Sequence, residues 1–100
     1  MFKTLEELVQ TIRSRKNSNQ SKSYTSQLLN NKILSKKKVE EELQELLEAI
    51  KIGKNLTHEA ADLLYHLLVL FECNDIKIEE VMKELQKRQK QSGLEEKASR

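Results

Sequence analysis

Two short stretches of the chain each carry a pair of acidic residues spaced three positions apart. Glu42 and Glu45 lie in EEELQELLEAI, residues 40–50, and Glu59 and Asp62 lie in HEAADLLYH, residues 58–66. Residues at this spacing share one face of an α-helix. Oxygen donors without thiolates suit Mg²⁺ or Mn²⁺. Each pair could therefore supply two ligands to a divalent cation, and Mg²⁺ is the expected one.

The second pair lies in a segment that is apolar on almost every side. Eight apolar residues stand between positions 63 and 71, whereas Glu59, Asp62 and His66 share one stripe about 60° wide on a helical projection. A buried carboxylate without a partner costs several kcal/mol. Pairing with lysines, exposure to solvent or binding of a cation would each resolve the conflict. We interpret His66 as a core histidine that a carboxylate satisfies.

The spacing of apolar residues predicts the helices that hold these side chains. On the helix that ends near Ile52, the expected core face comprises Val39, Leu43, Leu46, Leu47 and Ile50, and Glu42 borders it. Gly53 suits the left-handed position after a helix, and Thr57 is the expected N-cap of the next. Because the connection GKNLT is short, the two helices are expected to be antiparallel neighbours, with the four carboxylates converging.

Basic residues precede the acidic helix. If Ser35 caps this helix, Lys36, Lys37 and Lys38 lie at its N-terminus, where backbone N–H groups attract phosphate. The alternative is that the preceding helix continues without a break, so that no terminus exists. We expect Lys38 to contact a phosphorylated substrate. A water activated by the cation would lose its proton to a carboxylate such as Glu41.

Composition favours one all-α domain over residues 1–100. The chain has no proline and two glycines, and 37% of its residues are hydrophobic. Such a chain favours a small bundle of four to five helices with a thin core, completed by dimerisation. The expected helices are 2–13 with a Thr4–Glu7 capping box, 24–34, 35–52, 57–73 and 75–91. Residues 14–23 are expected to form a flexible loop, and residues 92–100 a polar tail.

Several classes of function are disfavoured. The basic first third would suit nucleic acid, but aromatic residues make up only 4% of the chain and no nucleic-acid-binding motif is present. Cys73 is a single cysteine, no segment approaches the ~20 apolar residues of a membrane span, and the start does not resemble a signal peptide. We therefore expect a cytoplasmic protein with neither nucleic-acid nor membrane partners.

The acidic motifs resemble those of a known family. EELQE followed by EAAD is similar to the paired Glu-Glu-x-x-Glu and Glu-x-x-Asp motifs of all-α, MazG-like nucleotide pyrophosphohydrolases. Within that group the chain resembles the phosphoribosyl-ATP pyrophosphohydrolases of histidine biosynthesis. The stretches that carry this resemblance are SYTSQLL (23–29), KVEEELQEL (38–46), EAADLLYHLLVL (59–70) and SGLEEKASR (92–100).

The resemblance implies Mg²⁺-dependent hydrolysis of phosphoribosyl-ATP to phosphoribosyl-AMP and pyrophosphate by a homodimer. It implies that Glu42, Glu45, Glu59 and Asp62 bind the metal, and that Glu41 is the base or a further ligand. It also implies substrate contacts from Ser23, Tyr24, Thr25, Ser92, Lys97 and Arg100. Two alternatives stay open: a house-cleaning nucleoside triphosphate pyrophosphohydrolase, and a non-enzymatic helical interaction module.

Overall fold

The computed structural model describes residues 1–20 and 22–90, and every regular element in these ranges is an α-helix. The helices are α1 (Lys3–Ser14), α2 (Tyr24–Leu29), α3 (Lys32–Ile52), α4 (Leu56–Cys73) and α5 (Ile78–Arg88). The predicted all-α bundle of four to five helices is confirmed. None of the described helices combines the length and the apolar character that a membrane span requires.

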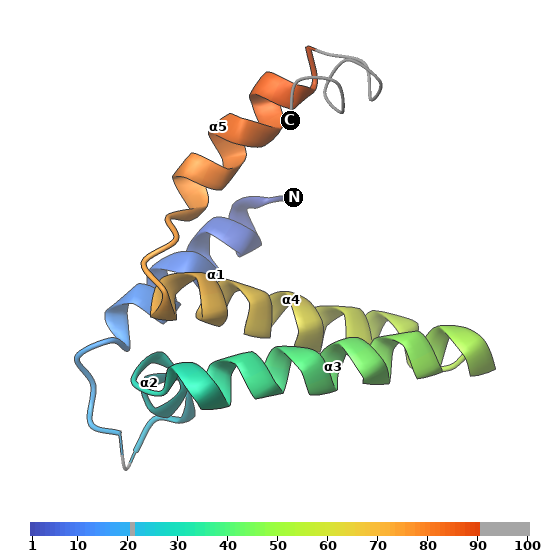
Figure 1. Cartoon of the computed structure of the whole chain (residues 1–100), viewed down its shortest axis with the longest axis horizontal. Coiled ribbons are helices and arrows are strands. Elements are labelled where there is room, and N and C mark those ends of the chain that lie inside the picture. Colours follow the sequence, from blue (N-terminus) through green and yellow to red (C-terminus); the bar gives the residue numbers. More distant parts are fainter. Residues whose placement is uncertain (21, 91–100) are drawn as a thin grey trace.

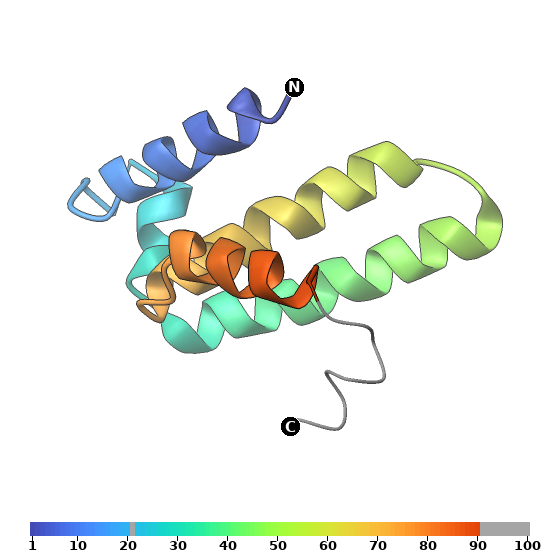
Figure 2. The same cartoon turned by 90° about the horizontal axis from the view of Figure 1, so that it is seen from above.

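Helices α3 and α4 form an antiparallel hairpin, which is the longest feature of the fold (Figures 1 and 2). Gly53 ends α3 in the left-handed conformation, with φ 75°, and its N–H donates to the carbonyl of Ala49 at 2.8 Å. A side chain is strained at this φ, so glycine suits the position. The predicted cap at Thr57 is wrong, because α4 begins one residue earlier, after Asn55, without a side-chain cap.

The apolar core lies at one end of this hairpin, where α1 and α2 pack against α4. Its buried residues come from three helices, and Leu28 and Val69 are the least exposed of them, at 1% each. The full set is Ile12, Leu28, Leu29, Leu68, Val69 and Cys73. The opposite end of the hairpin, near residues 53–55, extends beyond the other helices (Figure 2).

The junction between α2 and α3 differs from both sequence-based expectations. Helix α2 ends at Leu29, and Asn31 in extended backbone caps α3 by accepting the N–H of Leu34 at 3.0 Å. Ser35 lies inside α3, where its hydroxyl donates to the carbonyl of Leu28. Lys36, Lys37 and Lys38 therefore follow the first turn of α3, and the predicted anion site at the helix N-terminus is wrong.

Two further boundaries differ from the prediction. Helix α1 begins at Lys3, after Phe2, without a side-chain cap, so the predicted Thr4–Glu7 capping box is wrong. Helix α5 begins at Ile78 rather than at residue 75, because Asp75 adopts φ 58° and ends the preceding turn. Neither boundary has a side-chain cap, so the spacing of capping residues could not locate it.

The face that α3 turns toward α4 is not the apolar one. Leu43, Leu47 and Ile50 are 41%, 50% and 58% exposed, whereas Ala49 is buried and one oxygen of Glu42 is inaccessible to solvent. The predicted core face of α3 is therefore wrong for these three residues. Because Glu42 faces α4, the larger apolar side chains lie on an outer stripe of the hairpin.

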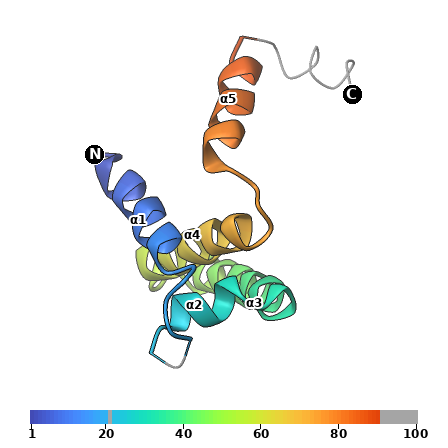
Figure 3. The ribbon, with the colours of Figure 1, turned by 90° about the vertical axis from the view of Figure 1, so that its left-hand side faces the viewer.

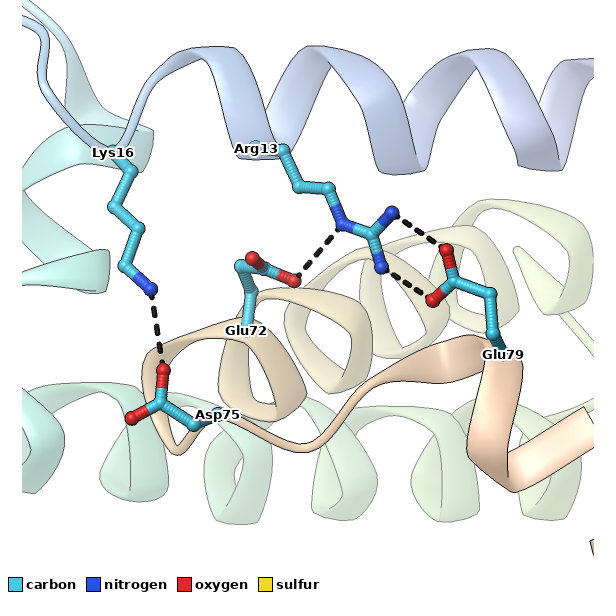
Figure 4. A network of polar contacts seen from close by, with 5 residues as sticks. All are labelled: Arg13, Lys16, Glu72, Asp75 and Glu79. Atoms are coloured by element: carbon cyan, nitrogen blue, oxygen red, sulfur yellow. Dashed lines mark hydrogen bonds and ion pairs between the residues drawn. The ribbon is translucent and has the colours of Figure 1, made fainter.

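Ion pairs join the end of α1 to the end of α4 and the start of α5. The guanidinium of Arg13 donates to both carboxylate oxygens of Glu79, at 2.8 and 2.6 Å, and its Nε donates to Glu72 at 3.3 Å (Figure 4). Lys16 contacts Asp75 at 3.3 Å. Hydrogen bonding by Arg13 lowers the pKa of Glu79 to about 2. Beyond this junction α1 and α5 diverge from each other (Figure 3).

Candidate metal centre

The structure brings together four carboxylates from the α3–α4 hairpin. Glu42 and Glu45 lie on α3, and Glu59 and Asp62 lie on α4. Each offers an oxygen that lies within 4.8 Å of the oxygens offered by the other three. The i,i+3 spacing on each helix aims two side chains at the partner helix, and the antiparallel arrangement places the two pairs opposite each other.

No lysine or arginine of the described residues forms an ion pair with these four carboxylates. In residues 1–20 and 22–90, the ion pairs of Lys36 and Lys38 go to Glu40 and Glu41, and no lysine or arginine pairs with the cluster. The Oε2 atoms of Glu42 and Glu59 are buried and accept no hydrogen bond from the described residues. In this part of the chain, lysines therefore do not neutralise the buried carboxylates.

Repulsion and burial raise the pKa values of two of these carboxyl groups. Burial, followed by hydrogen bonding and charge from Glu45, raises the pKa of Glu42 to about 7. Burial, followed by the charge of Glu45, also raises the pKa of Glu59. A proton or a bound cation would relieve this burial and repulsion at neutral pH. Four oxygen donors, with two buried oxygens that lack a hydrogen-bond partner among residues 1–20 and 22–90, fit a hard divalent cation.

His66 lies on the same face of α4, one turn beyond Asp62. The residue is 8% exposed, and its ring centroid lies 4.9 Å from that of Tyr65 and 6.2 Å from that of Tyr24. Its Nδ1 atom is buried and has no hydrogen-bond partner among the described residues, so the expected carboxylate partner is absent at this nitrogen. Burial lowers the pKa of His66, and Lys38 lowers it further.

The first turn of α2 borders this region. Ser23 caps α2 by accepting the N–H of Ser26 at 3.1 Å, and Thr25 forms a short hydrogen bond with the hydroxyl of Tyr65. Tyr24 is 48% exposed, and burial raises its pKa while Lys38 opposes that shift. Of the three residues expected to contact substrate here, Ser23 and Thr25 thus have partners inside the chain, and Tyr24 presents an accessible ring.

Glu41 and Lys38 lie beside the cluster rather than in it. Nζ of Lys38 is 3.2 Å from an oxygen of Glu41, and both side chains are partly exposed. Glu41 does not belong to the group of four mutually close carboxylates. The other expected substrate contacts, Ser92, Lys97 and Arg100, lie outside the described residues.

The motifs did not point to two further residues of this region. Tyr65 joins α4 to α2 through Thr25. His58 lies with its Nε2 atom 3.3 Å from an oxygen of Asp62. The i,i+4 spacing of His58 and Asp62 was a signal for this second contact. Nothing in the spacing pointed to Tyr65, because its partner is forty positions away.

The fold and this site define a class of all-α protein in which two antiparallel helices present paired carboxylates to each other. The model of the phosphoribosyl-ATP pyrophosphohydrolase family matches residues 5–89, and the chain belongs to this family. The resemblance that the motifs indicated is thereby confirmed.

Curated relatives agree over nearly the full length of the chain. A phosphoribosyl-ATP pyrophosphatase of Caulobacter sp. (strain K31) is 42% identical, covering 100% of this chain and 95% of the relative. One of Allorhizobium ampelinum is 44% identical, covering 97% and 96%. One of Neisseria meningitidis serogroup C is 48% identical, covering 96% and 92%.

Proposed function

We propose that this protein hydrolyses phosphoribosyl-ATP to phosphoribosyl-AMP and pyrophosphate, the second step of histidine biosynthesis. Membership of the family over residues 5–89 carries this proposal. The carboxylate cluster supports it, because a divalent cation held by these carboxylates would stabilise negative charge on the phosphate oxygens during hydrolysis of a phosphoanhydride. Water adds to one phosphorus, one phosphoanhydride P–O bond breaks, and pyrophosphate leaves.

Glu42, Glu45, Glu59 and Asp62 would hold Mg²⁺, for which Mn²⁺ could substitute. The buried Oε2 atoms of Glu42 and Glu59, which accept no hydrogen bond in the described part of the chain, support this assignment. Once bound, the cation would neutralise phosphate charge and lower the pKa of a bound water. Each of the four side chains offers one oxygen within 4.8 Å of those offered by the others, so the group would need little rearrangement to bind a cation.

The roles of the flanking residues follow from their positions. Glu41, next to the cluster and partly exposed, would accept the proton of the attacking water. Lys38, 3.2 Å from Glu41, would contact substrate phosphate and place positive charge at the edge of an acidic site. The accessible ring of Tyr24 would meet the substrate, with Ser23 and Thr25 holding the start of α2 in place. Ser92, Lys97 and Arg100 would contact substrate by family resemblance.

A homodimer is the second part of the proposal. Leu43, Leu47 and Ile50 lie at i, i+4 and i+7 on α3 and are each at least 41% exposed. An apolar stripe on the longest helix is typical of a surface that packs against another protein. A second copy packed on the α3–α4 hairpin would cover it. The single free thiol, Cys73, suits a reducing compartment, so we also propose a cytoplasmic location.

The proposed reaction is tested by supplying phosphoribosyl-ATP and ATP side by side with Mg²⁺ and following the release of pyrophosphate. We expect release from phosphoribosyl-ATP to be about 100-fold faster or more, because a site with groups for the second ribose phosphate discriminates strongly against a substrate that lacks it. Equal rates would favour a general nucleoside triphosphate pyrophosphohydrolase. No release from either would favour the interaction module.

A further inference from the structure

Tyr65 ties the helix that carries two of the carboxylates to the short helix α2. Its hydroxyl forms a hydrogen bond with the hydroxyl of Thr25, in the first turn of α2, and both side chains are partly buried. We propose that Tyr65 is a positioning residue, which holds the start of α2, and with it Tyr24, in place for the substrate. The inference rests on the proposed function, because Tyr24 is one of the residues proposed to meet phosphoribosyl-ATP.

One face of α4 leads from the carboxylate cluster to this hydrogen bond. Tyr65 follows Asp62 by three positions and His66 follows it by four, so the three side chains share one side of the helix. Three residues of helix advance the chain by about 5 Å. The start of α2 is therefore held against the same helix that supplies Glu59 and Asp62, one turn beyond them.

Tyr24 stands between this part of α4 and the edge of the cluster. Its ring centroid lies 6.2 Å from that of His66, which in turn lies 4.9 Å from that of Tyr65. Burial raises the pKa of Tyr24, Lys38 opposes that shift, and the charge of Glu42 contributes to it. The ring is 48% exposed, so its outer side is accessible. A substrate bound at the carboxylates and at Lys38 would therefore meet Tyr24.

Helix α2 is too short to hold its own position. It has six residues, and isolated helices of this length are not stable in water. Its second half is anchored in the core, to which Leu28 and Leu29 belong. In its first half, the hydroxyl of Ser26 donates to the carbonyl of Ser18 at 2.8 Å, in the segment before α2. These contacts leave the first turn to be fixed against the site.

The hydrogen bond of Tyr65 provides that attachment. Among the described residues it is the one side-chain hydrogen bond between α2 and α4. Its loss would let the first turn of α2 shift while the leucines stay in the core. The substrate would then bind only the fraction of molecules that keep Tyr24 in place, which weakens its apparent affinity. The expected effect is on KM rather than kcat, because a contact made equally in the ground state and the transition state affects binding alone.

Tyr65→Phe removes the hydroxyl and keeps the ring. We expect KM for phosphoribosyl-ATP to rise about threefold to tenfold, the range that a hydrogen bond inside a protein contributes, and kcat to stay within about twofold. Without substrate, amide hydrogen exchange should quicken at Ser26 and Gln27, whose N–H groups donate to Ser23, and stay unchanged in residues 40–50. An unchanged KM would overturn the proposal. A raised KM with parent-like exchange would also overturn it, because Tyr65 would then act without moving α2.

Thr25→Val removes the other hydroxyl of the pair and keeps the size of the side chain. We expect its KM to rise as in Tyr65→Phe, and the double variant to behave like either single variant, because both changes remove the same hydrogen bond. Effects on KM that multiply in the double variant would show that the two hydroxyls act separately, and would overturn the proposal.

Ser35→Ala is the matched control. It removes the hydrogen bond from Ser35 to the carbonyl of Leu28, at the other end of α2. Because this bond is buried, the variant should lose at least as much melting temperature as Tyr65→Phe, yet keep KM within about twofold of the parent. An equal rise in KM would show that any loosening of α2 weakens substrate binding, and would overturn the specific role of Tyr65.

The parent enzyme and its Mg²⁺ affinity separate this inference from the proposed function. If the parent releases no pyrophosphate from phosphoribosyl-ATP, the proposed function fails and the role of Tyr65 fails with it. If the parent turns over and Tyr65→Phe has the same KM, the inference alone fails. Calorimetric titration with Mg²⁺ in the absence of substrate should give the parent and Tyr65→Phe the same affinity. A weaker affinity in the variant would show that Tyr65 acts on the carboxylates instead of α2, and would overturn the proposal.

Discussion

Glu42 on α3 and Glu59 on α4 each offer an oxygen to the same group of four carboxylates, and each carries a buried Oε2 atom that accepts no hydrogen bond from the described residues. Two carboxylates in this relationship repel each other, and each loses hydration by burial. Without a cation, this repulsion and loss of hydration therefore lower the stability of the α3–α4 hairpin. A cation bound there would convert the same arrangement from a cost into a source of stability.

Mg²⁺ should raise the melting temperature of the parent, because it binds the folded state. In Glu42→Gln the repulsion is reduced but a ligand is lost. We expect this variant to melt higher than the parent in chelator and to show a much smaller shift with millimolar Mg²⁺. Differential scanning fluorimetry measures both, with the exposed Glu48→Gln as a matched control that should behave like the parent. A parent-like Mg²⁺ shift in Glu42→Gln would contradict the assignment of Glu42 as a ligand.

The pH dependence of stability should report the same cluster. The pKa of Glu42 is raised to about 7 in the fold, from an ordinary value of 4.5, so the folded state retains a proton that the unfolded chain has lost. Its contribution to stability is therefore greatest below pH 4.5 and falls as the pH rises toward 7. Urea titrations of the metal-free protein should show this decline, and Glu42→Gln should lessen it. If the free energy of unfolding of Glu42→Gln fell with pH as steeply as that of the parent, Glu42 would not be the source of the decline.

The contribution of Glu79 to stability should depend on pH in the opposite direction. Its pKa is lowered to about 2 by Arg13, so its stabilising effect is present above pH 4.5 and is lost as the pH falls toward 2. Since Arg13 joins α1 to the start of α5, Glu79→Gln should speed amide hydrogen exchange several-fold in α5 while leaving the α3–α4 hairpin unchanged. Glu80→Gln, which alters the next residue, is the control. Parent-like exchange in α5 would show that other contacts hold this helix.

The exposed stripe on α3 predicts the oligomeric state. Leu47→Glu places a charge in the middle of the stripe, whereas Gln44→Glu adds the same charge on the same helix beside it. Sedimentation velocity should show a dimer for the parent and for Gln44→Glu, and a monomer or a much weaker dimer for Leu47→Glu. A dimer unaffected by Leu47→Glu would place the interface elsewhere.

Much of the architecture could be predicted from local patterns. The absence of proline and the helical spacing of apolar residues indicated an all-α bundle, and Gly53 marked the turn of the hairpin. These features depend on residues close in sequence. The start of α3 was harder, because Asn31 and Ser35 are both plausible caps, and only the packing of Ser35 against Leu28 decides between them.

Tertiary relationships explain the remaining differences. Helical projection placed Leu43, Leu47 and Ile50 in the core, on the assumption that the apolar face of a helix turns inward. In the structure Glu42 faces α4 instead, and the apolar stripe is exposed. An apolar face on a helix does not by itself show whether it packs in the core of its own chain or lies on the surface. The contact between Thr25 and Tyr65 likewise depends on how α2 crosses α4.

Turnover of phosphoribosyl-ATP by Asp62→Asn, compared with Glu48→Gln, tests the central claim most directly. Asparagine preserves the size of the side chain but removes its charge, so we predict a loss of kcat of about 100-fold or more, since ligand carboxylates support charge stabilisation worth several kcal/mol. Glu48→Gln, on the exposed side of α3, should stay within about twofold of the parent. If Asp62→Asn turned over within a few-fold of the parent, the carboxylate cluster would not be the metal centre of this reaction.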